Sequence, residues 1–477
     1  MTQRPLDPRN PSRRRFLAGM AAAGTTLALP GCGRPSLNSV ADVPPLPDPA
    51  ASGIDHIVQV MMENRSFDHF LGWVPGADTQ QGRTFKNSAG ADVSTFALAA
   101  DPAYGFQGCG WADPNHNYEA GRIHLAGGAM DGFLLSEDTA LNAEDKFPVG
   151  YYRREDLPFY AGVADNFTIC DRYFHGILSS TFPNRIYIHA GATDRNSNTL
   201  PYAQQAPSVL PTIWDLLADA GVSAKNYFSD LPLTGLWGPK YADITAPYEQ
   251  FLIDAAAGTL PQVSYFDPFF GFSVGESPAG ISRDDHPQAD VRDGQAYLAE
   301  IYDALRASPN WERTLMIVTY DEWGGFYDHV VPPFAPVTPE EATFNDGRLG
   351  FRTPCVILGP RARRAHVSHL QFDPNSVINL IRWRFGLGPV GTSGRNETSL
   401  NMAYALDFAG APNLAAPDFS VPVGPGGARG VPFGSLCTEA VPLPLPKPMS
   451  SAAQKSRAEH LAEFEPLAQM CRRYGLI

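Results

Sequence analysis

The chain has 477 residues, of which 44% are hydrophobic and 18% charged, so it can bury a large core and is neither disordered nor fibrous. Its formal charge is -14, and the first 32 residues hold five arginines and one aspartate, so removing this net +4 leaves -18. A surface this acidic argues against nucleic acid as a partner and against anionic lipid, which makes zwitterionic lipid the better lipid substrate.

The first segment has the pattern of an export signal. Residues 12–17 (SRRRFL) match the twin-arginine pattern, and the apolar run over 17–29 is too short to span a bilayer. A disordered basic arm is the alternative, but it does not explain why the apolar run directly follows the arginines. We predict a signal segment over residues 1–32 and export by the twin-arginine route, to the periplasm or out of the cell.

The signal is followed by a tether and one large domain. Residues 29–32 (LPGC) resemble a lipoprotein box with an atypical proline, so Cys32 is a candidate lipid anchor. Residues 33–52 are proline-rich and predict a stiff, extended tether. We expect residues 53–477 to form a single domain with a Pro/Gly-rich C-terminal extension from about residue 410, and no later stretch is apolar enough to cross a membrane.

The pattern along the domain predicts an α/β fold. Short apolar runs at 57–62, 262–266, 313–320 and 354–358 predict buried strands. Apolar residues at helical spacing over 213–217, 298–305 and 377–381 predict amphipathic helices. Alternating strands and helices indicate a mainly parallel central sheet with helices on both faces, and the 44 glycines and 44 prolines predict long loops. Ligands in such folds bind beyond the carboxyl ends of the strands.

Two of these strands end in polar pairs, Glu63-Asn64 and Asp321-Glu322. Their oxygen donors and three negative charges suit a divalent cation and are costly to gather without one. Because neither pair contains histidine, Ca²⁺, Mg²⁺ or Mn²⁺ fit at least as well as Zn²⁺. For Asp321-Glu322 taken alone, solvated loop carboxylates are the alternative.

The third candidate element is the segment 179–188 (SSTFPNRIYI). Thr181 is predicted as a helix N-cap with Pro183 in the first turn, which would place its hydroxyl where backbone N–H groups favour a phosphate. A metal beside it would favour the alkoxide, so Thr181 is a candidate nucleophile, with a simple capping role as the alternative. Arg185 fits either a phosphate ligand or a structural ion pair.

Four separated blocks of the sequence resemble the bacterial phosphoesterase family of non-haemolytic-type phospholipases C and related acid phosphatases. The blocks are 63–69 (ENRSFDH), 181–185 (TFPNR), 285–287 (DHP) and 320–333 (YDEWGGFYDHVVPP). Their order and spacing match as well, from about residue 54 to residue 387. The resemblance implies an alkaline phosphatase-like fold and the hydrolysis of phosphoesters.

The resemblance also implies roles for individual residues. Thr181 matches the family's serine or threonine nucleophile, and His286 matches a histidine near the phosphoryl group. His116 matches an upstream active-site histidine. The metal-site positions are matched by Glu63, Asn64, Asp321 and Glu322. Of the further histidines that the acid phosphatase branch carries, none stands between His189 and His286.

These roles predict a two-step displacement at phosphorus. Thr181 attacks, His116 or His286 protonates the departing oxygen, and water then hydrolyses the phosphothreonine. We expect a phospholipase C with peripheral membrane contact, favoured by Thr181 and the aromatic-rich stretch 266–272. A broad-specificity acid phosphatase acting on small phosphoesters is the alternative, and a non-catalytic exported lipoprotein is the second. A sulfatase does not fit, because the secondary alcohol of Thr181 cannot yield formylglycine.

Other polar residues are expected to be structural. Asp68 and Asp328 are expected to brace loops through hydrogen bonds. Three histidines are expected more often at the surface or in a supporting role than in contact with substrate: His329, His366 and His369. The cysteines show no CxxC spacing, which argues against a zinc knuckle or a thioredoxin-type site. Cys170 and Cys355 are read as buried free thiols, and Cys437 with Cys471 is the first disulfide pair to test.

Overall fold

A computed structural model of the chain describes residues 45–101, 105–108, 110–136, 145–198, 207–272, 282–421 and 450–477. All of them belong to the unit formed by residues 38–477. The signal segment 1–32 with Cys32 lies outside the described residues, so export and lipidation stay predictions. Cys437 also lies outside them, but its suggested disulfide partner Cys471 is free, so the structure does not contain that disulfide. Of the predicted tether, residues 45–52 are described and include a 3₁₀ helix at Pro49–Ala51. No helix in the described part is long and apolar enough to cross a membrane.

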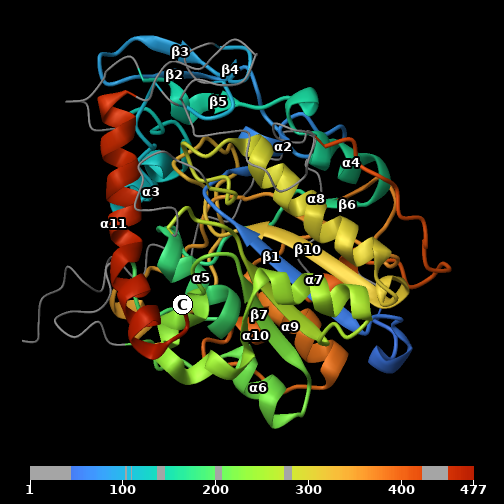
Figure 1. Ribbon diagram of the computed structural model, residues 1–477. Coiled ribbons are helices and arrows are strands. Elements are labelled where there is room, and N and C mark those ends of the chain that lie inside the picture. The colour runs from blue at the N-terminus through green and yellow to red at the C-terminus, as the bar shows by residue number, and fades with distance from the viewer. Residues whose placement is uncertain are drawn as a thin grey trace, which may run out of the picture. The chain divides into compact units, whose positions relative to one another are not determined.

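An eight-stranded sheet lies at the centre of this unit (Figure 1), with the order β12-β6-β11-β10-β1-β9-β7-β8. Only β11 runs antiparallel to its neighbours, so the predicted α/β fold with a mainly parallel sheet is confirmed. Two small pairs, β2-β3 and β4-β5, lie apart from the main sheet. The strands are β1 (His56–Met62), β2 (Thr84–Lys86), β3 (Asp92–Ser94), β4 (Phe96–Ala97), β5 (Gly150–Tyr151), β6 (Thr168–Cys170), β7 (Ala224–Phe228), β8 (Thr245–Pro247), β9 (Val263–Asp267), β10 (Thr314–Tyr320), β11 (Cys355–Leu358) and β12 (His366–Ser368).

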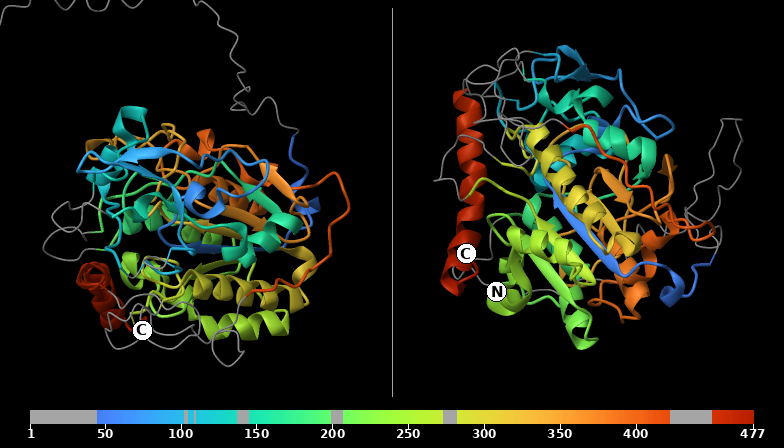
Figure 2. Two further views of the ribbon diagram at one scale, coloured as in Figure 1. Left: turned by 90° about the horizontal axis from the view of Figure 1, so that it is seen from above. Right: turned by 45° about the vertical axis from the view of Figure 1, so that its right-hand side comes forward.

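Helices cover both faces of the main sheet, as predicted (Figures 1 and 2). The crossovers through α7 and α8 run along the sheet in one direction, whereas the crossover through α5 and α6 runs the other way. Because such connections are right-handed, the two groups lie on opposite faces. Accordingly α8 packs with α4 and α7, and α5 packs with α6 and α9. The helices are α2 (Phe67–Leu71), α3 (Tyr118–Leu125), α4 (Pro158–Asn166), α5 (Thr181–Ala190), α6 (Ile213–Asp219), α7 (Tyr248–Ala257), α8 (Val291–Ala307), α9 (Pro374–Phe385), α10 (Arg395–Thr398) and α11 (Ser451–Tyr474).

The central strands β1 and β10 fix the level of the candidate site. Both are apolar and almost wholly buried, and they pair in parallel with Met62 opposite Tyr320. The next residue of each strand, Glu63 and Asp321, therefore leaves the sheet at the same edge. This is the carboxyl edge at which the sequence predicts a ligand site.

The C-terminal extension is a finding that the sequence analysis missed. Instead of continuing as Pro/Gly-rich chain, it includes the 24-residue helix α11. Its buried apolar residues recur at helical spacing, at Phe464, Leu467, Ala468 and Cys471. Cys471 packs over Gly235 of the 3₁₀ segment Leu233–Ile244, where a β-carbon would lie 2.4 Å from its sulfur. The helical signal was present, but the prolines before residue 450 obscured it.

The three described cysteines are all free and buried, at Cys170, Cys355 and Cys471. This confirms the prediction of buried free thiols for the first two. The antiparallel register of β6 and β11, with Ile169 opposite Val356, places Cys170 and Cys355 side by side. Burial raises the pKa of the Cys355 thiol well above its usual range, which keeps that thiol protonated and unreactive.

Candidate active site

Backbone hydrogen bonds join the segments that carry the predicted site residues. The Glu63 N–H donates to the carbonyl of Asp284 at 2.8 Å, and the Asn64 N–H donates to Asp321 Oδ1 at 3.1 Å. All four residues are buried. The ends of β1 and β10 and the loop before α8 thus converge at one point, although they are far apart in the sequence.

Asn64 adopts a left-handed backbone conformation, with φ of 60°. Such a turn at a strand end redirects the chain sharply, and asparagine tolerates it better than most residues. Gly324 packs against this turn so closely that a β-carbon there would lie 2.2 Å from the Asn64 carbonyl oxygen. The glycine after Asp321-Glu322 is therefore required for the two polar pairs to meet.

Thr181 is the first residue of α5, and the N-cap is Ser180, whose backbone is extended. The predicted N-cap position of Thr181 is therefore wrong by one residue. The reason is the loop before the helix, which Asn184 holds by donating from Nδ2 to the carbonyls of Ile177, Ser179 and Ser180 at 2.8 to 3.1 Å. The Thr181 hydroxyl caps nothing and has no hydrogen-bond partner among the described residues.

Arg185 lies one helical turn after Thr181, on the same face of α5, and its guanidinium is fully bonded. Its nitrogens lie 3.2 Å from Glu63 Oε1 and 3.4 Å from Asp321 Oδ2. They also donate to the carbonyls of Met61 and Met62 at 2.9 and 3.2 Å. Of the two roles open for Arg185, the structure contains the structural ion pair, which anchors the first turns of α5 to the ends of β1 and β10.

Several buried oxygens around this point have no hydrogen-bond partner among the described residues. They belong to Glu63 (Oε2), Asn64 (Oδ1), Thr181 (Oγ1), Asp284 (Oδ2) and Glu322 (Oε1). Burial, with the charge of Asp321, raises the pKa of Glu63 well above its usual range, and burial likewise raises that of Glu322. Unpaired carboxylate oxygens gathered out of water are what a divalent cation would stabilise, so this donor set fits a metal.

His116 and His286 lie on either side of one carboxylate, that of Asp113. Asp113 Oδ2 is 3.6 Å from His116 Nδ1 and 3.5 Å from His286 Nε2. His116 also reaches the predicted metal positions, with its Nε2 3.3 Å from Asn64 Nδ2 and 3.6 Å from Glu322 Oε1. The structure therefore brings both predicted histidines to the same cluster as the predicted metal ligands.

These three groups differ in how they hold protons. Burial alone would lower the pKa of His116, but the carboxylates of Glu322 and Asp113 outweigh it and raise that pKa to about 10. Burial, with the charge of His460, lowers the pKa of His286 well below its usual range. Burial also raises the pKa of Asp113 to about 7. The pKa values of the two imidazoles are thus shifted in opposite directions, which is the asymmetry that separate acid and base roles require.

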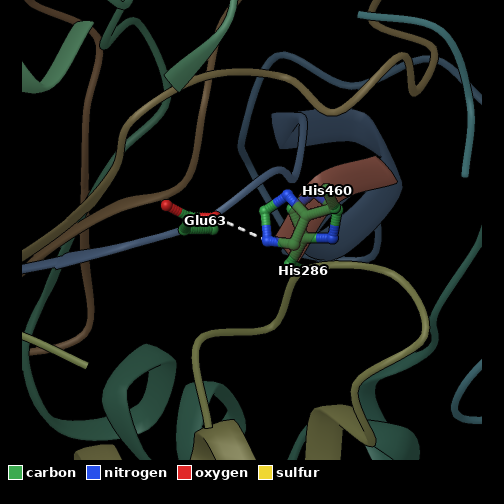
Figure 3. A group of neighbouring side chains, drawn as sticks. All are labelled: Glu63, His286 and His460. Atoms are coloured by element: carbon green, nitrogen blue, oxygen red, sulfur yellow. Dashed lines mark ion pairs between the residues drawn. The ribbon is translucent and has the colours of Figure 1, made fainter. Parts of the chain in front are cut away.

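His460, on α11, is a site residue that the sequence analysis missed (Figure 3). Its ring stacks on His286 with centroids 3.5 Å apart, and its Nε2 lies 4.0 Å from Glu63 Oε2. The ligand atoms of Glu63, His286 and His460 all lie within 4.8 Å of one another. Two imidazole nitrogens beside Glu63 are donors that suit Zn²⁺, so Zn²⁺ stays among the candidate ions with Ca²⁺, Mg²⁺ and Mn²⁺.

A second acidic cluster near the motifs is occupied by an arginine. Asp68 and Asp328 are buried, and the Arg352 guanidinium lies 3.4 Å from Asp68 Oδ1 and 3.0 Å from Asp328 Oδ1. His329 also pairs with Asp68, at 2.6 Å. This network joins α2 to the loop after β10, as the bracing role predicted. His369 pairs with Asp171 instead, at 2.7 Å, and is largely exposed.

Comparison with known proteins gives consistent matches. The family model described as the phosphoesterase family matches residues 54–388. Phospholipase C B of Mycobacterium tuberculosis is 31% identical over a 518-residue alignment, which covers 93% of this chain and 96% of that protein. Non-specific phospholipase C1 of Arabidopsis thaliana is 31% identical over 366 residues, which is 70% of this chain and 67% of that protein. A solved protein in the alkaline phosphatase superfamily from Vibrio parahaemolyticus is 14% identical, with a TM-score of 0.33, and covers 49% of this chain and 61% of that one.

Proposed function

The chain belongs to the phosphoesterase family and is a phosphoric ester hydrolase, and from this premise we propose that it is a metal-dependent phospholipase C that works through a phosphothreonine at Thr181. The family membership confirms the resemblance predicted from the four sequence blocks. The observation that carries the finer proposal is the unpartnered Thr181 hydroxyl, buried at the start of α5 one helical turn before Arg185, which pairs with Glu63 and Asp321.

In the proposed mechanism, Thr181 Oγ1 loses its proton to one imidazole of the pair His116 and His286, attacks phosphorus, and the bond to the departing oxygen breaks. His116 or His286 gives that oxygen a proton, so diacylglycerol leaves as an alcohol. The phosphorus is then esterified to Thr181 and still carries the head group. A water molecule attacks it, the bond to Thr181 Oγ1 breaks, and the phosphorylated head group is released while a proton from the water restores the Thr181 hydroxyl. Asp113, within 3.6 Å of both imidazoles, orients the two rings for these transfers.

A divalent cation held by Glu63, Asn64, Asp321 and Glu322 would supply positive charge that favours the alkoxide of Thr181 and offsets charge on the phosphoryl oxygens. Of these four, Asp321 is already engaged through both oxygens, by the N–H groups of Asn64 and Glu322 and by Arg185. Asp284, which has a free Oδ2, is an additional candidate ligand.

The phospholipase C reading is supported by the relatives, which are named phospholipases C in a mycobacterium and a plant. Of the four phenylalanines in the stretch that was predicted to favour lipid, Phe269 is half-buried, and Phe266, Phe270 and Phe272 are buried, at most 8% exposed. They pack rather than present a lipid surface, so support for a lipid substrate comes from the relatives and not from this stretch. A phosphomonoesterase is the alternative, because it uses the same core.

We expect the purified protein to hydrolyse phosphatidylcholine and phosphatidylethanolamine, and p-nitrophenyl phosphorylcholine faster than p-nitrophenyl phosphate. Treatment with a chelator should abolish the activity, because like-charged carboxylates would then face the nucleophile, and a divalent cation should restore it. Hydrolysis of the phospholipids is measured by release of diacylglycerol, and hydrolysis of the p-nitrophenyl esters by release of p-nitrophenol. Preference for p-nitrophenyl phosphate would favour the acid phosphatase alternative, and full activity after chelation would exclude metal dependence.

We also propose that the protein is exported through its twin-arginine segment. Replacing Arg13 and Arg14 by lysine keeps the charge but removes the paired guanidinium groups, so a merely electrostatic leader would tolerate the change. We expect the double variant to accumulate inside the cell as active, unprocessed protein, measured by fractionation and mass. If the double variant appears outside the inner membrane in normal amounts, the twin-arginine assignment is wrong and residues 1–32 are an ordinary secretory signal.

A further inference from the structure

Helix α11 lies outside the family match, which ends at residue 388, yet one of its faces borders the candidate active site. The Ser456 hydroxyl oxygen accepts a hydrogen bond from the Asp113 N–H at 3.0 Å. One turn further on, His460 stacks on His286. The N-terminal half of α11 therefore contacts two of the groups that surround the proposed reaction.

The same face also reaches the start of α5. The ring of Phe464 packs on Phe182, the residue after Thr181, with centroids 5.1 Å apart. The Phe182 N–H donates to Asn198 Oδ1 at 2.7 Å, and Asn198 donates in turn to Glu463 Oε2 at 2.5 Å. The contacts of α11 thus extend from the histidine pair to the proposed nucleophile.

Arg457 is the residue of this face whose bonding is incomplete. Its side chain is buried, at 1% exposure, and Nη2 donates to the carbonyl of Phe270 at 2.9 Å. Nε and Nη1 have no hydrogen-bond partner among the described residues. Arg185, by contrast, has all three nitrogens bonded. Leaving charged donors buried and unpaired costs free energy, so Nε and Nη1 of Arg457 would be stabilised by an anionic ligand that accepts their hydrogen bonds.

The surroundings of Arg457 indicate where that partner would bind. Its positive charge interacts with the carboxylates of Asp284, Glu63 and Asp113. The same charge contributes to lowering the pKa of His286 and of His460. It nevertheless makes no ion pair with a carboxylate in the described part of the chain. The attachment of α11 does not require it either, because Phe464, Leu467, Ala468 and Cys471 supply the buried apolar contacts.

We propose that Arg457 binds the phosphoryl oxygens of the substrate, which makes α11 part of the active site. This assignment rests on the proposed phosphoesterase site. Guanidinium donors suit phosphate, since two N–H groups can bond two oxygens of one anion. His460 acts beside it as a positioning residue, because its ring covers one face of His286. A phosphate group would then lie between the nucleophile on α5 and the cation on α11.

The test is direct binding of inorganic phosphate and orthovanadate to the full chain, measured by calorimetry so that no turnover is needed. Arg457→Gln should weaken phosphate binding at least tenfold, as expected for loss of a charge-assisted hydrogen bond. Arg457→Lys should recover part of that loss. Cys471→Ala is the matched control: it loosens α11 against Gly235 without touching the site, so its phosphate affinity should equal that of the wild type.

Two results would overturn the assignment: phosphate affinity of Arg457→Gln within twofold of the wild type, or an equal loss in Cys471→Ala. Absence of saturable binding by the wild-type protein would also overturn it. Turnover is scored separately. If the wild type hydrolyses phospholipids and Arg457→Gln binds phosphate as tightly as the wild type, the proposed function stands and this inference fails. If phosphate binding depends on Arg457 but the wild type turns over no phosphoester, this inference stands and the proposed function fails.

Discussion

Replacing Thr181 by alanine should lower kcat by at least about a thousandfold while leaving the fold intact, as expected when a covalent nucleophile is removed. The fold should tolerate the change because the Thr181 hydroxyl makes no hydrogen bond among the described residues and Ser180, not Thr181, is the N-cap. We therefore expect a melting temperature equal to or above that of the wild type. Wild-type protein that is acid-quenched during turnover of phosphatidylcholine should carry phosphocholine on Thr181, measured by peptide mass spectrometry, and the variant should carry none.

Thr181→Ser is the matched control for this experiment. It keeps a hydroxyl at the same position, so we expect it to retain measurable turnover and to carry the phosphocholine group on the serine hydroxyl instead. Near-normal turnover in folded Thr181→Ala would end the covalent proposal and leave a water molecule as the attacking group.

Replacing Glu322 by glutamine should release the metal and lower activity at least about a hundredfold. One oxygen of Glu322 accepts a bond from the Gly324 N–H at 2.6 Å, and the other has no hydrogen-bond partner in the described structure. Glutamine preserves the first contact, while it removes one of the negative charges that would hold the cation. Metal content after dialysis, measured by mass spectrometry of the elements, and turnover in the same samples check the expectation.

Asp328→Asn is the control carboxylate, because Asp328 belongs to the second acidic cluster. We expect it to keep both metal and activity but to unfold more easily, by about 3 kcal/mol, since Arg352 loses a buried partner. Full metal occupancy in Glu322→Gln, or metal loss in Asp328→Asn, would move the ion away from the predicted positions.

The positions of the central strands and of the polar pairs at their ends could be predicted from the sequence, because they depend on local apolar runs and on the parallel sheet edge. The runs at 57–62 and 313–320 are β1 and β10, and their parallel register brings Glu63 and Asp321 to one edge, as the polar pairs at the strand ends predicted. The antiparallel direction of β11 could not be read from its sequence, because a short buried strand has the same apolar pattern in either direction.

The missed residues share a different property, since each depends on a long-range contact. Asp113 contacts both His116 and His286 only because the fold brings the loop before α8, which carries His286, to it. Asp284 meets Glu63 through a backbone hydrogen bond between segments that are distant in the sequence. Arg457 and His460 lie on a helix beyond residue 388, where the match to the family model ends. A buried Arg-x-x-His spacing with apolar residues on the same helical face was the available signal, but alone it equally fits ordinary packing.

The distance along the chain between Glu63 and His460 has a consequence for synthesis in the cell. The two residues are 397 positions apart (460 minus 63), yet they meet in one cluster. At about 5 to 20 residues per second, a ribosome needs about 20 to 80 s between them. Until α11 emerges, His286 lacks its stacked ring and the cluster is incomplete. A nascent chain without α11 therefore lacks part of the cluster that we propose to act on phospholipids, including those of the cell that makes it.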